Sequence, residues 1–180
     1  MERAVVFAGF GGQGLLFAGQ VLAQAALAQG RGVLWIPSYG PEMRGGTASC
    51  TVIIGDEPIG SPVVDAYVGV VALNAPSAAK FASLVARDGV LLINSDAVSD
   101  DAENGSGRLA LPLAQMALDA GDGRSISVVA LGALAARLGL VSREALERAL
   151  TMMTAKHPEI LAADLAALSL GWRAGQTSAD

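Results

Sequence analysis

The stretch AVVFAGFGGQGLLFAGQVLAQAALAQGRGVLWI, residues 4–36, decides the fold class of this chain. Its first six residues form a short apolar run of strand type, and a glycine-rich turn follows at 9–14. Residues 15–29 have the pattern of a helix that is apolar on most of its faces, and Gly30 closes it. Residues 32–36 form a second apolar strand. Strand, turn, helix and strand in this order predict a βαβ unit and hence a parallel sheet.

The segment 47–54 alternates between apolar and polar residues, which predicts a strand with one covered face. Its polar side, Thr47, Ser49 and Thr51, indicates an antiparallel or edge strand that is only partly covered. Asn74 and Ser142 are placed to cap helices. We predict further strands at 67–73, 90–94 and 108–111, and helices at 75–86, at 126–138, after Ser142 and from Pro158 onward.

No internal repeat and no linker divides the chain, so we expect one domain over residues 1–180. The acidic segment 99–107 is expected to be a surface loop, and residues 175–180 a frayed tail. The elements together predict an α/β fold. We expect a three-layer α/β/α sandwich with a mostly parallel, Rossmann-like sheet that is mixed at one edge, and a helical C-terminal part.

The composition is apolar: 52% of the 180 residues are hydrophobic and 16% are charged. Since a soluble domain carries about 25% charged residues, either small residues fill the core or a partner covers part of the surface. The net charge of −5 and the scarcity of aromatic residues argue against nucleic-acid binding. No apolar run reaches the roughly 18–20 residues of a membrane span.

The first ten residues are better explained as a buried strand than as a signal peptide, because an acid stands near the start and glycines interrupt the apolar run. Cys50 is the sole cysteine, so no internal disulfide can form, and we expect a cytoplasmic protein. A single cysteine cannot hold an iron–sulfur cluster, and His157 as the sole histidine excludes a Cys/His zinc site.

Gly121-Asp122-Gly123 begins like the thiamine diphosphate fingerprint, in which the aspartate binds magnesium. That fingerprint needs asparagines about 25–30 residues later, because the metal requires several oxygen ligands. Residues 145–154 contain no asparagine, so we interpret the triplet as a turn before a helix. We therefore predict no metal and no cofactor on this chain.

Gly9, Gly11 and Gly14 match the dinucleotide-binding pattern between a strand and a helix. The second strand, however, ends Trp-Ile-Pro-Ser without the acid that would bind ribose hydroxyls, which argues against nicotinamide or flavin. Two readings stay open: the glycines only permit a tight turn and close packing, or the loop binds another anion or a partner. The candidate ligand- or partner-facing residues here are Gly11, Gly12, Gln13 and Gly14.

The segment SYGPEMRGG, residues 38–46, follows the second predicted strand. Arg44 could present its guanidinium to a carboxylate or phosphate, or it could pair with Glu42 and shape the loop. Both glycine-rich loops leave carboxyl ends of strands joined by one crossover, so we expect them side by side. The candidate residues of this second loop are Ser38, Tyr39, Glu42, Arg44, Gly45 and Gly46.

No nucleophile stands in a convincing local motif, and His157 before Pro158 is interpreted as a helix-start residue, so no catalytic residue is predicted. On the residues alone, one possible function is a free-standing nucleotide- or anion-binding α/β module that uses the loop at 9–14.

GFGGQG at 9–14 and SYGPEMRGGT at 38–47, in this order and spacing, resemble the gamma subunits of 2-oxoacid:ferredoxin oxidoreductases. The likeness covers most of residues 4–155, and the sequence around Glu42 and Arg44 is most similar to that of the 2-oxoglutarate branch. Where many relatives carry asparagine, this chain has Ser127. The likeness continues through Ser61-Pro62, Leu73-Asn74, Asn94-Ser95-Asp96 and Val129-Ala130-Leu131-Gly132.

The resemblance implies a subunit of a complex that oxidatively decarboxylates a 2-oxoacid, such as 2-oxoglutarate or pyruvate, to an acyl-CoA while reducing ferredoxin. It implies that thiamine diphosphate and magnesium lie between alpha and beta subunits, and that iron–sulfur clusters lie on a beta or delta subunit. Ferredoxin and coenzyme A act at the level of the complex. The isolated chain is then expected to be inactive, with a structural and assembly role.

Overall fold

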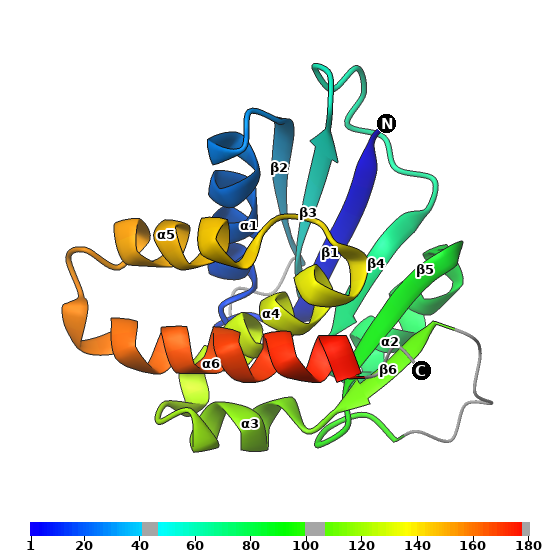
Figure 1. The fold of residues 1–180 in the computed structure, drawn as a ribbon. Coiled ribbons are helices and arrows are strands. Elements are labelled where there is room, and N and C mark those ends of the chain that lie inside the picture. The colour runs from blue at the N-terminus through cyan, green and yellow to red at the C-terminus, as the bar shows by residue number, and fades with distance from the viewer. Residues whose placement is uncertain (41–46, 100–106, 178–180) are drawn as a thin grey trace.

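The computed structural model describes residues 1–40, 47–99 and 107–177 of the chain. Figure 1 shows one α/β unit in which a twisted sheet lies against a group of helices. The elements in chain order are β1 (Arg3–Phe10), α1 (Leu15–Ala28), β2 (Gly32–Tyr39), β3 (Thr47–Gly55), β4 (Tyr67–Ala72), α2 (Ala75–Phe81), the 3₁₀ turn η1 (Ala82–Leu84), β5 (Val85–Asn94), β6 (Arg108–Leu111), α3 (Leu113–Asp119), the 3₁₀ turn η2 (Gly123–Ser125), α4 (Ile126–Leu138), α5 (Arg143–Met153) and α6 (Pro158–Thr177).

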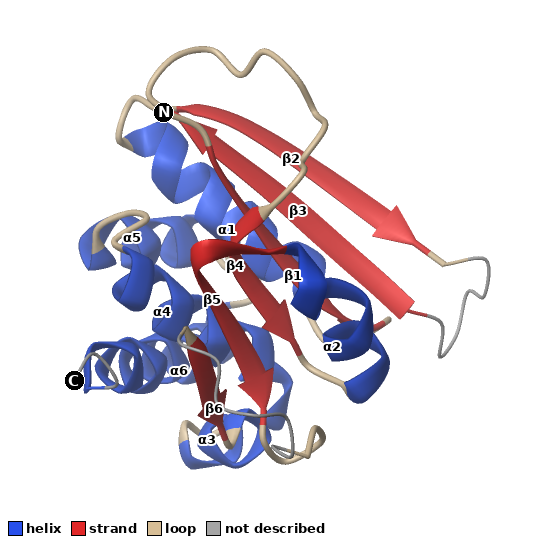
Figure 2. Ribbon diagram, turned by 90° about the vertical axis from the view of Figure 1, so that its right-hand side faces the viewer, coloured by secondary structure: helices blue, strands red, loops and turns tan. Residues whose placement is uncertain are grey.

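Within the described ranges the sheet has six strands, in the order β2-β3-β1-β4-β5-β6. Strands β1, β4, β5 and β6 pair in parallel, whereas β3 is antiparallel to both of its neighbours, β1 and β2. Helices α1, α4, α5 and α6 lie on one side of the sheet, and α2 lies on the other (Figure 2). The predicted α/β/α sandwich with a mostly parallel sheet is therefore confirmed, although its second helical layer is thin.

The position of β3 departs from the prediction in one respect. It is antiparallel, as expected, but the edge strand is β2, and β3 lies between β2 and β1. The crossover through α1 leaves a gap of one strand, and the chain folds back after β2 to fill it. The polar side of β3 is only partly covered, as predicted: Thr47 is exposed, and Ser49 and Thr51 are half-buried.

Strand β2 runs through Pro37 to Tyr39, three residues past its predicted end. Gly40 donates its N–H to the Thr47 carbonyl at 2.9 Å, continuing the register in which Pro37 faces Cys50. Because hydrogen-bonded pairs alternate along an antiparallel ladder, the nitrogen of Pro37 points away from β3. A proline at such an edge position removes no ladder hydrogen bond, so the strand tolerates it.

The helix predicted over 75–86 is shorter, because α2 ends at Phe81 and β5 already begins at Val85. Val85 pairs with Tyr67 of β4, ahead of an irregularity in the register between Tyr67 and Gly69. A β-branched residue with a partner on the neighbouring strand favours extended structure. That partner is distant in sequence, so local periodicity does not indicate it.

The C-terminal helices match the prediction closely. Ser142 accepts a hydrogen bond from Ala145 N at 3.2 Å at the start of α5, and Asn74 accepts one from Ser77 N at 2.8 Å at the start of α2. Helix α6 continues through Thr177, so the frayed tail was predicted to begin too early. None of the helices in the described ranges is both long and apolar enough to cross a membrane.

Two arginines hold the carboxyl end of helix α4 at the edge of the sheet where the strands begin. Arg3 is the first residue of β1, and Arg31 directly precedes β2. Arg3 donates to the Leu138 carbonyl at 2.7 Å, and Arg31 donates to the Leu140 carbonyl at 2.8 Å. These bonds satisfy carbonyl groups that a helix end leaves free. Because the strands start at this edge, the amino end of α4 lies towards the carboxyl edge of the sheet, where the glycine-rich loop emerges.

Candidate functional site

The loop between β1 and α1 is shaped by two glycines and one glutamine. Gly12 and Gly14 have φ angles of 92° and 76°, in the left-handed region that glycine adopts at little cost. The Gln13 side chain folds back and accepts a hydrogen bond from Phe10 N at 2.7 Å. A Cβ at Gly9 would overlap the Gln13 Oε1 atom, so glycine there leaves room for this folded-back side chain.

Helix α1 starts directly after this loop with its amino end open. No side chain caps it at Gly14, and its first turn contains no acid. The first backbone N–H groups of a helix lack partners within the helix and carry a partial positive charge. The loop therefore presents hydrogen-bond donors at the carboxyl edge of the sheet.

The described parts of the two predicted loops lie side by side. Residues 10–12 and Tyr39 line one hollow of about 390 Å³, together with Phe17. Two aromatic side chains on it face solvent, since Phe10 is 38% exposed and Tyr39 is 67% exposed. We call the surface formed by residues 10–14 and Tyr39 the loop face.

Ser38 is exposed next to Tyr39 at the end of β2. The predicted residues Glu42, Arg44, Gly45 and Gly46 lie outside the described residues, so their role stays a prediction.

A second hollow, of about 240 Å³, opens on the other side of the glycine-rich loop. Gly12 and Gly14 line it, as do Ser127 of α4 and Asp164 of α6. The Ser127 hydroxyl oxygen lies 2.6 Å from the place that a Cβ on Gly14 would occupy. Gly14 is thus required both for its left-handed backbone and for its contact with α4.

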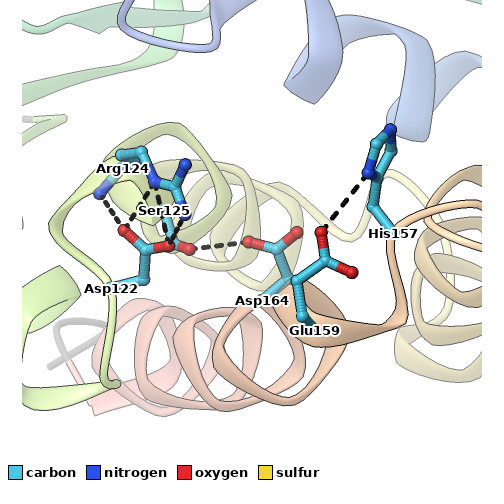
Figure 3. Close-up of polar contacts among 6 residues, drawn as sticks. All are labelled: Asp122, Arg124, Ser125, His157, Glu159 and Asp164. Atoms are coloured by element: carbon cyan, nitrogen blue, oxygen red, sulfur yellow. Dashed lines mark hydrogen bonds and ion pairs between the residues drawn. The ribbon is translucent and has the colours of Figure 1, made fainter.

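A cluster of polar side chains borders this second hollow (Figure 3). The Arg124 guanidinium binds both carboxylate oxygens of Asp122, at 2.7 and 3.0 Å, and this pairing lowers the pKa of Asp122. Ser125 donates its hydroxyl to Asp164 Oδ1 at 2.6 Å. Asp164 is only 4% exposed, and its burial raises its pKa above the ordinary value of 3.8, outweighing the Ser125 hydrogen bond.

Replacing Asp164 by Asn is expected to raise the free energy of unfolding at neutral pH. The pKa of Asp164 is raised in the folded state, so protonation of its carboxyl stabilises the fold. This stabilisation is complete below the pKa of the unfolded chain, about 3.8. Stability is therefore lost as the pH rises from about 3.8 through the folded pKa. Asn is neutral at every pH, and its Oδ1 can still accept from Ser125. Urea unfolding should show Asp164→Asn above the wild type at pH 7, with the difference vanishing below pH 3.8. Asp65→Asn, at an exposed position, is the control; a variant less stable at neutral pH would contradict the assignment.

Several other candidates have structural roles. The Gly121-Asp122-Gly123 triplet is a turn before a helix, as predicted, with Asp122 accepting from Arg124 N at 2.9 Å. His157 precedes α6 and lies 3.3 Å from Glu159. Burial raises the pKa of Cys50 to about 12, so its thiol is not a ready nucleophile. Within the described ranges, no three His, Cys, Asp or Glu side chains gather closely enough to hold a metal ion.

A larger open hollow, of about 780 Å³, lies between α5 and α6. Among its lining residues, Arg143 pairs with Glu147 at 2.8 Å on the surface of α5. Such i, i+4 pairs contribute little beyond helix stability. We therefore place the candidate functional site at the carboxyl edge of the sheet and not in this hollow.

The Ser125–Asp164 contact was missed from the sequence. Asp164 stands three residues after Leu161 in the apolar stripe of α6, and an acid in such a stripe was the available signal. Asp96, which follows β5, accepts hydrogen bonds from Ala114 N at 2.8 Å and Gln115 N at 3.1 Å. It therefore stabilises the start of α3.

The fold and the site define an α/β domain with a glycine-rich loop and an exposed aromatic surface at the carboxyl edge of its sheet. Residues 4–174 match the family model described as pyruvate ferredoxin/flavodoxin oxidoreductase. The chain belongs to this family.

Two curated relatives illustrate the range of the family. The chain is 42% identical over 173 residues to the ketoisovalerate oxidoreductase subunit VorA of Methanothermobacter thermautotrophicus, covering 94% of this chain and 36% of VorA. It is 33% identical over 163 residues to the 2-oxoglutarate synthase subunit KorC of Methanocaldococcus jannaschii, covering 88% of this chain and 87% of KorC. The chain thus spans about a third of the length of VorA but nearly all of KorC.

Solved structures agree on the fold. The gamma subunit of a keto/oxoacid ferredoxin oxidoreductase from Geobacter sulfurreducens superposes with a TM-score of 0.81 at 32% identity, over 98% of this chain and 99% of that one. The 2-oxoglutarate:ferredoxin oxidoreductase of Magnetococcus marinus, with 2-oxoglutarate, coenzyme A and succinyl-CoA bound, gives a TM-score of 0.87 at 24% identity. There the match covers 98% of this chain and 31% of the other, and it supports the fold alone.

Proposed function

We propose that this chain is the gamma subunit of a 2-oxoacid:ferredoxin oxidoreductase and that it docks on its partner subunits through the loop face. The observation that carries the proposal is the exposure of Phe10 and Tyr39 around an open helix end, on a chain that offers no convincing nucleophile. Exposed aromatic residues around a hollow are typical of protein interfaces. The similarity to KorC over most of both chains supports a separate subunit of this size.

In this proposal the reaction takes place on the partners. A 2-oxoacid, coenzyme A and oxidised ferredoxin give an acyl-CoA, carbon dioxide and reduced ferredoxin, with thiamine diphosphate, magnesium and iron–sulfur clusters on alpha, beta and delta subunits. For the substrate we propose 2-oxoglutarate, on the strength of KorC and of the motif around Arg44. The greater identity to VorA favours ketoisovalerate as the alternative. Turnover of the assembled complex with each acid distinguishes the two.

The loop face is tested by replacing Tyr39 with Asp and measuring assembly with the alpha and beta subunits. An aromatic residue at the centre of an interface contributes about 2 kcal/mol or more, which is roughly a 30-fold or greater loss of affinity. The melting temperature of the free chain should stay nearly unchanged, because Tyr39 is 67% exposed.

Leu27→Asp is the matched control, since Leu27 is 50% exposed at the far end of α1 and the charge change is the same. Assembly that tolerates Tyr39→Asp but fails with Leu27→Asp would place the interface elsewhere.

A further inference from the structure

Helix α1 and strand β2 form a surface without charge. From residue 4 to residue 41 the sequence contains one charged residue, Arg31. That side chain makes its contacts within the chain, since it donates to the Leu140 carbonyl at 2.8 Å and pairs with Asp56 at 3.2 Å. Charged residues are depleted at the centre of protein interfaces, so a long uncharged surface indicates an interface.

A hollow of about 360 Å³ opens between α1 and β2. Its lining is uncharged and includes Gln20, Gln24, Leu27, Val33, Trp35 and Met153. Gln24 is exposed on α1, and Leu27 is 50% exposed. Trp35 and Met153 are half-buried and pack against the core at the side of the hollow. We call the surface formed by α1, β2 and Met153 the α1–β2 face.

Strand β2 adds an open sheet edge to this face. Among the described strands it is the outermost on its side, and its sequence GVLWIPSY carries no charge (Figure 2). Because hydrogen-bonded pairs alternate along the ladder with β3, Val33 and Trp35 point their N–H and C=O groups away from β3. Native sheets protect a long edge with charged side chains or proline, and here only Pro37 does so. The edge is therefore open to another strand at Val33 and Trp35.

A second copy of this chain matches the α1–β2 face better than a partner of another kind. Glutamine amides and the free groups of a strand edge both donate and accept hydrogen bonds, so each complements a copy of itself. A two-fold axis brings the same side chains together, and an uncharged face meets its copy without repulsion between like charges. The described residues of the face offer no charged group to a partner that is recognised by charge.

We propose that two copies of this chain associate through the α1–β2 face, with their β2 strands antiparallel about a two-fold axis at Leu34. Val33 of one copy then pairs with Trp35 of the other, and the N–H and C=O groups of both are used. A β-branched residue opposite an aromatic one is a favourable cross-strand pair. Pro37, which has no N–H to donate, lies outside the paired centre. The two α1 helices lie on the same side of the joined sheet, where their glutamines meet.

Sedimentation of the full chain alone between about 1 and 200 µM tests the proposal. The wild type is expected to approach twice its monomer mass of 18.2 kDa as the concentration rises. Gln24→Glu and Gln24→Lys each place like charges on both sides of the axis, so each should weaken self-association at least tenfold. A mixture of the two variants should form dimers again, because the same surface of both copies makes the contact. Gln176→Glu and Gln176→Lys, at an exposed position of α6, are the matched controls and should dimerise like the wild type.

Amide hydrogen exchange gives a second readout at the strand edge. The N–H groups of Val33 and Trp35 should be protected in the wild-type dimer and exchange at least tenfold faster in Gln24→Glu, because only a second strand can bond to them. The N–H groups of Leu34 and Ile36 face β3 and should stay protected in both chains. A loss of protection at all four positions would indicate unfolding of β2 and would count against the proposal.

The inference does not rest on the proposed docking function. Leu27→Asp should lose self-association and keep its affinity for the alpha and beta subunits, whereas Tyr39→Asp should do the reverse. The proposal is overturned if the wild type sediments as a monomer throughout the range, if its dimer withstands both Gln24 variants, or if the mixed variants do not associate. A monomeric wild type whose Gln24→Glu variant binds the alpha and beta subunits less tightly would assign the face to those subunits instead.

Discussion

A Gly171→Val chain is expected to lose about 3 kcal/mol or more of its free energy of unfolding and to melt roughly 6–12 °C below the wild type. The cause is the contact between α4 and α6, where the two helix backbones touch. A Cβ at Gly171 would overlap the Val129 carbonyl oxygen and come within 2.8 Å of its carbon. Backbone atoms cannot rotate aside as a side chain can, so the helices would have to separate.

Thermal unfolding followed by circular dichroism measures this effect, and Gly60→Val is the matched control. A Cβ at Gly60 meets nothing within 4 Å, and its backbone is outside the left-handed region. A Gly171→Val chain that melts within about 2 °C of the wild type, a shift worth less than about 1 kcal/mol, would contradict this account of the contact.

The contact matters for the site because it holds α6 against α4. Gly132 and Gly175 are also placed where a Cβ would overlap the backbone of the opposite helix. This close approach brings Asp164 of α6 to Ser125 at the start of α4, a contact between residues 39 positions apart. The second hollow beside the glycine-rich loop therefore depends on glycines more than a turn of helix away from it.

Elements with strong local signals could be predicted from the sequence. The apolar run of 126–138 matches α4 at both ends, and Asn74 and Ser142 cap the helices that they were expected to cap. Each of these signals lies within a few residues of the structure that it specifies. The same is true of the glycine-rich turn, whose spacing predicted the step from β1 to α1.

Features that depend on distant partners could not be predicted in this way. The insertion of β3 between β1 and β2 follows from pairing along its whole length with both strands. The early start of β5 depends on Tyr67, far from Val85 in sequence. The same holds near the candidate site: the position of the glycine-rich loop between β1 and α1 was predicted, whereas the bond between Ser125 and Asp164 was not.

Ser127 shows most clearly that contacts between residues distant in sequence could not be predicted. The resemblance marked it as a departure from the asparagine of many relatives, but the sequence alone gave it no contact. The structure places its hydroxyl against Gly14. Only the packing of α4 onto the glycine-rich loop brings the two together.

The central claim is that this chain is a subunit that takes part in the assembly of the complex and does not itself catalyse the reaction. It is tested most directly by measuring 2-oxoacid-dependent ferredoxin reduction by the alpha and beta subunits of the proposed complex, with this chain present, absent and alone. The account predicts turnover when all subunits are present, its loss when this chain is omitted, and no turnover, bound thiamine or iron for the chain alone. Turnover by the purified chain, after contaminating subunits are removed, or full turnover without it, would contradict the account.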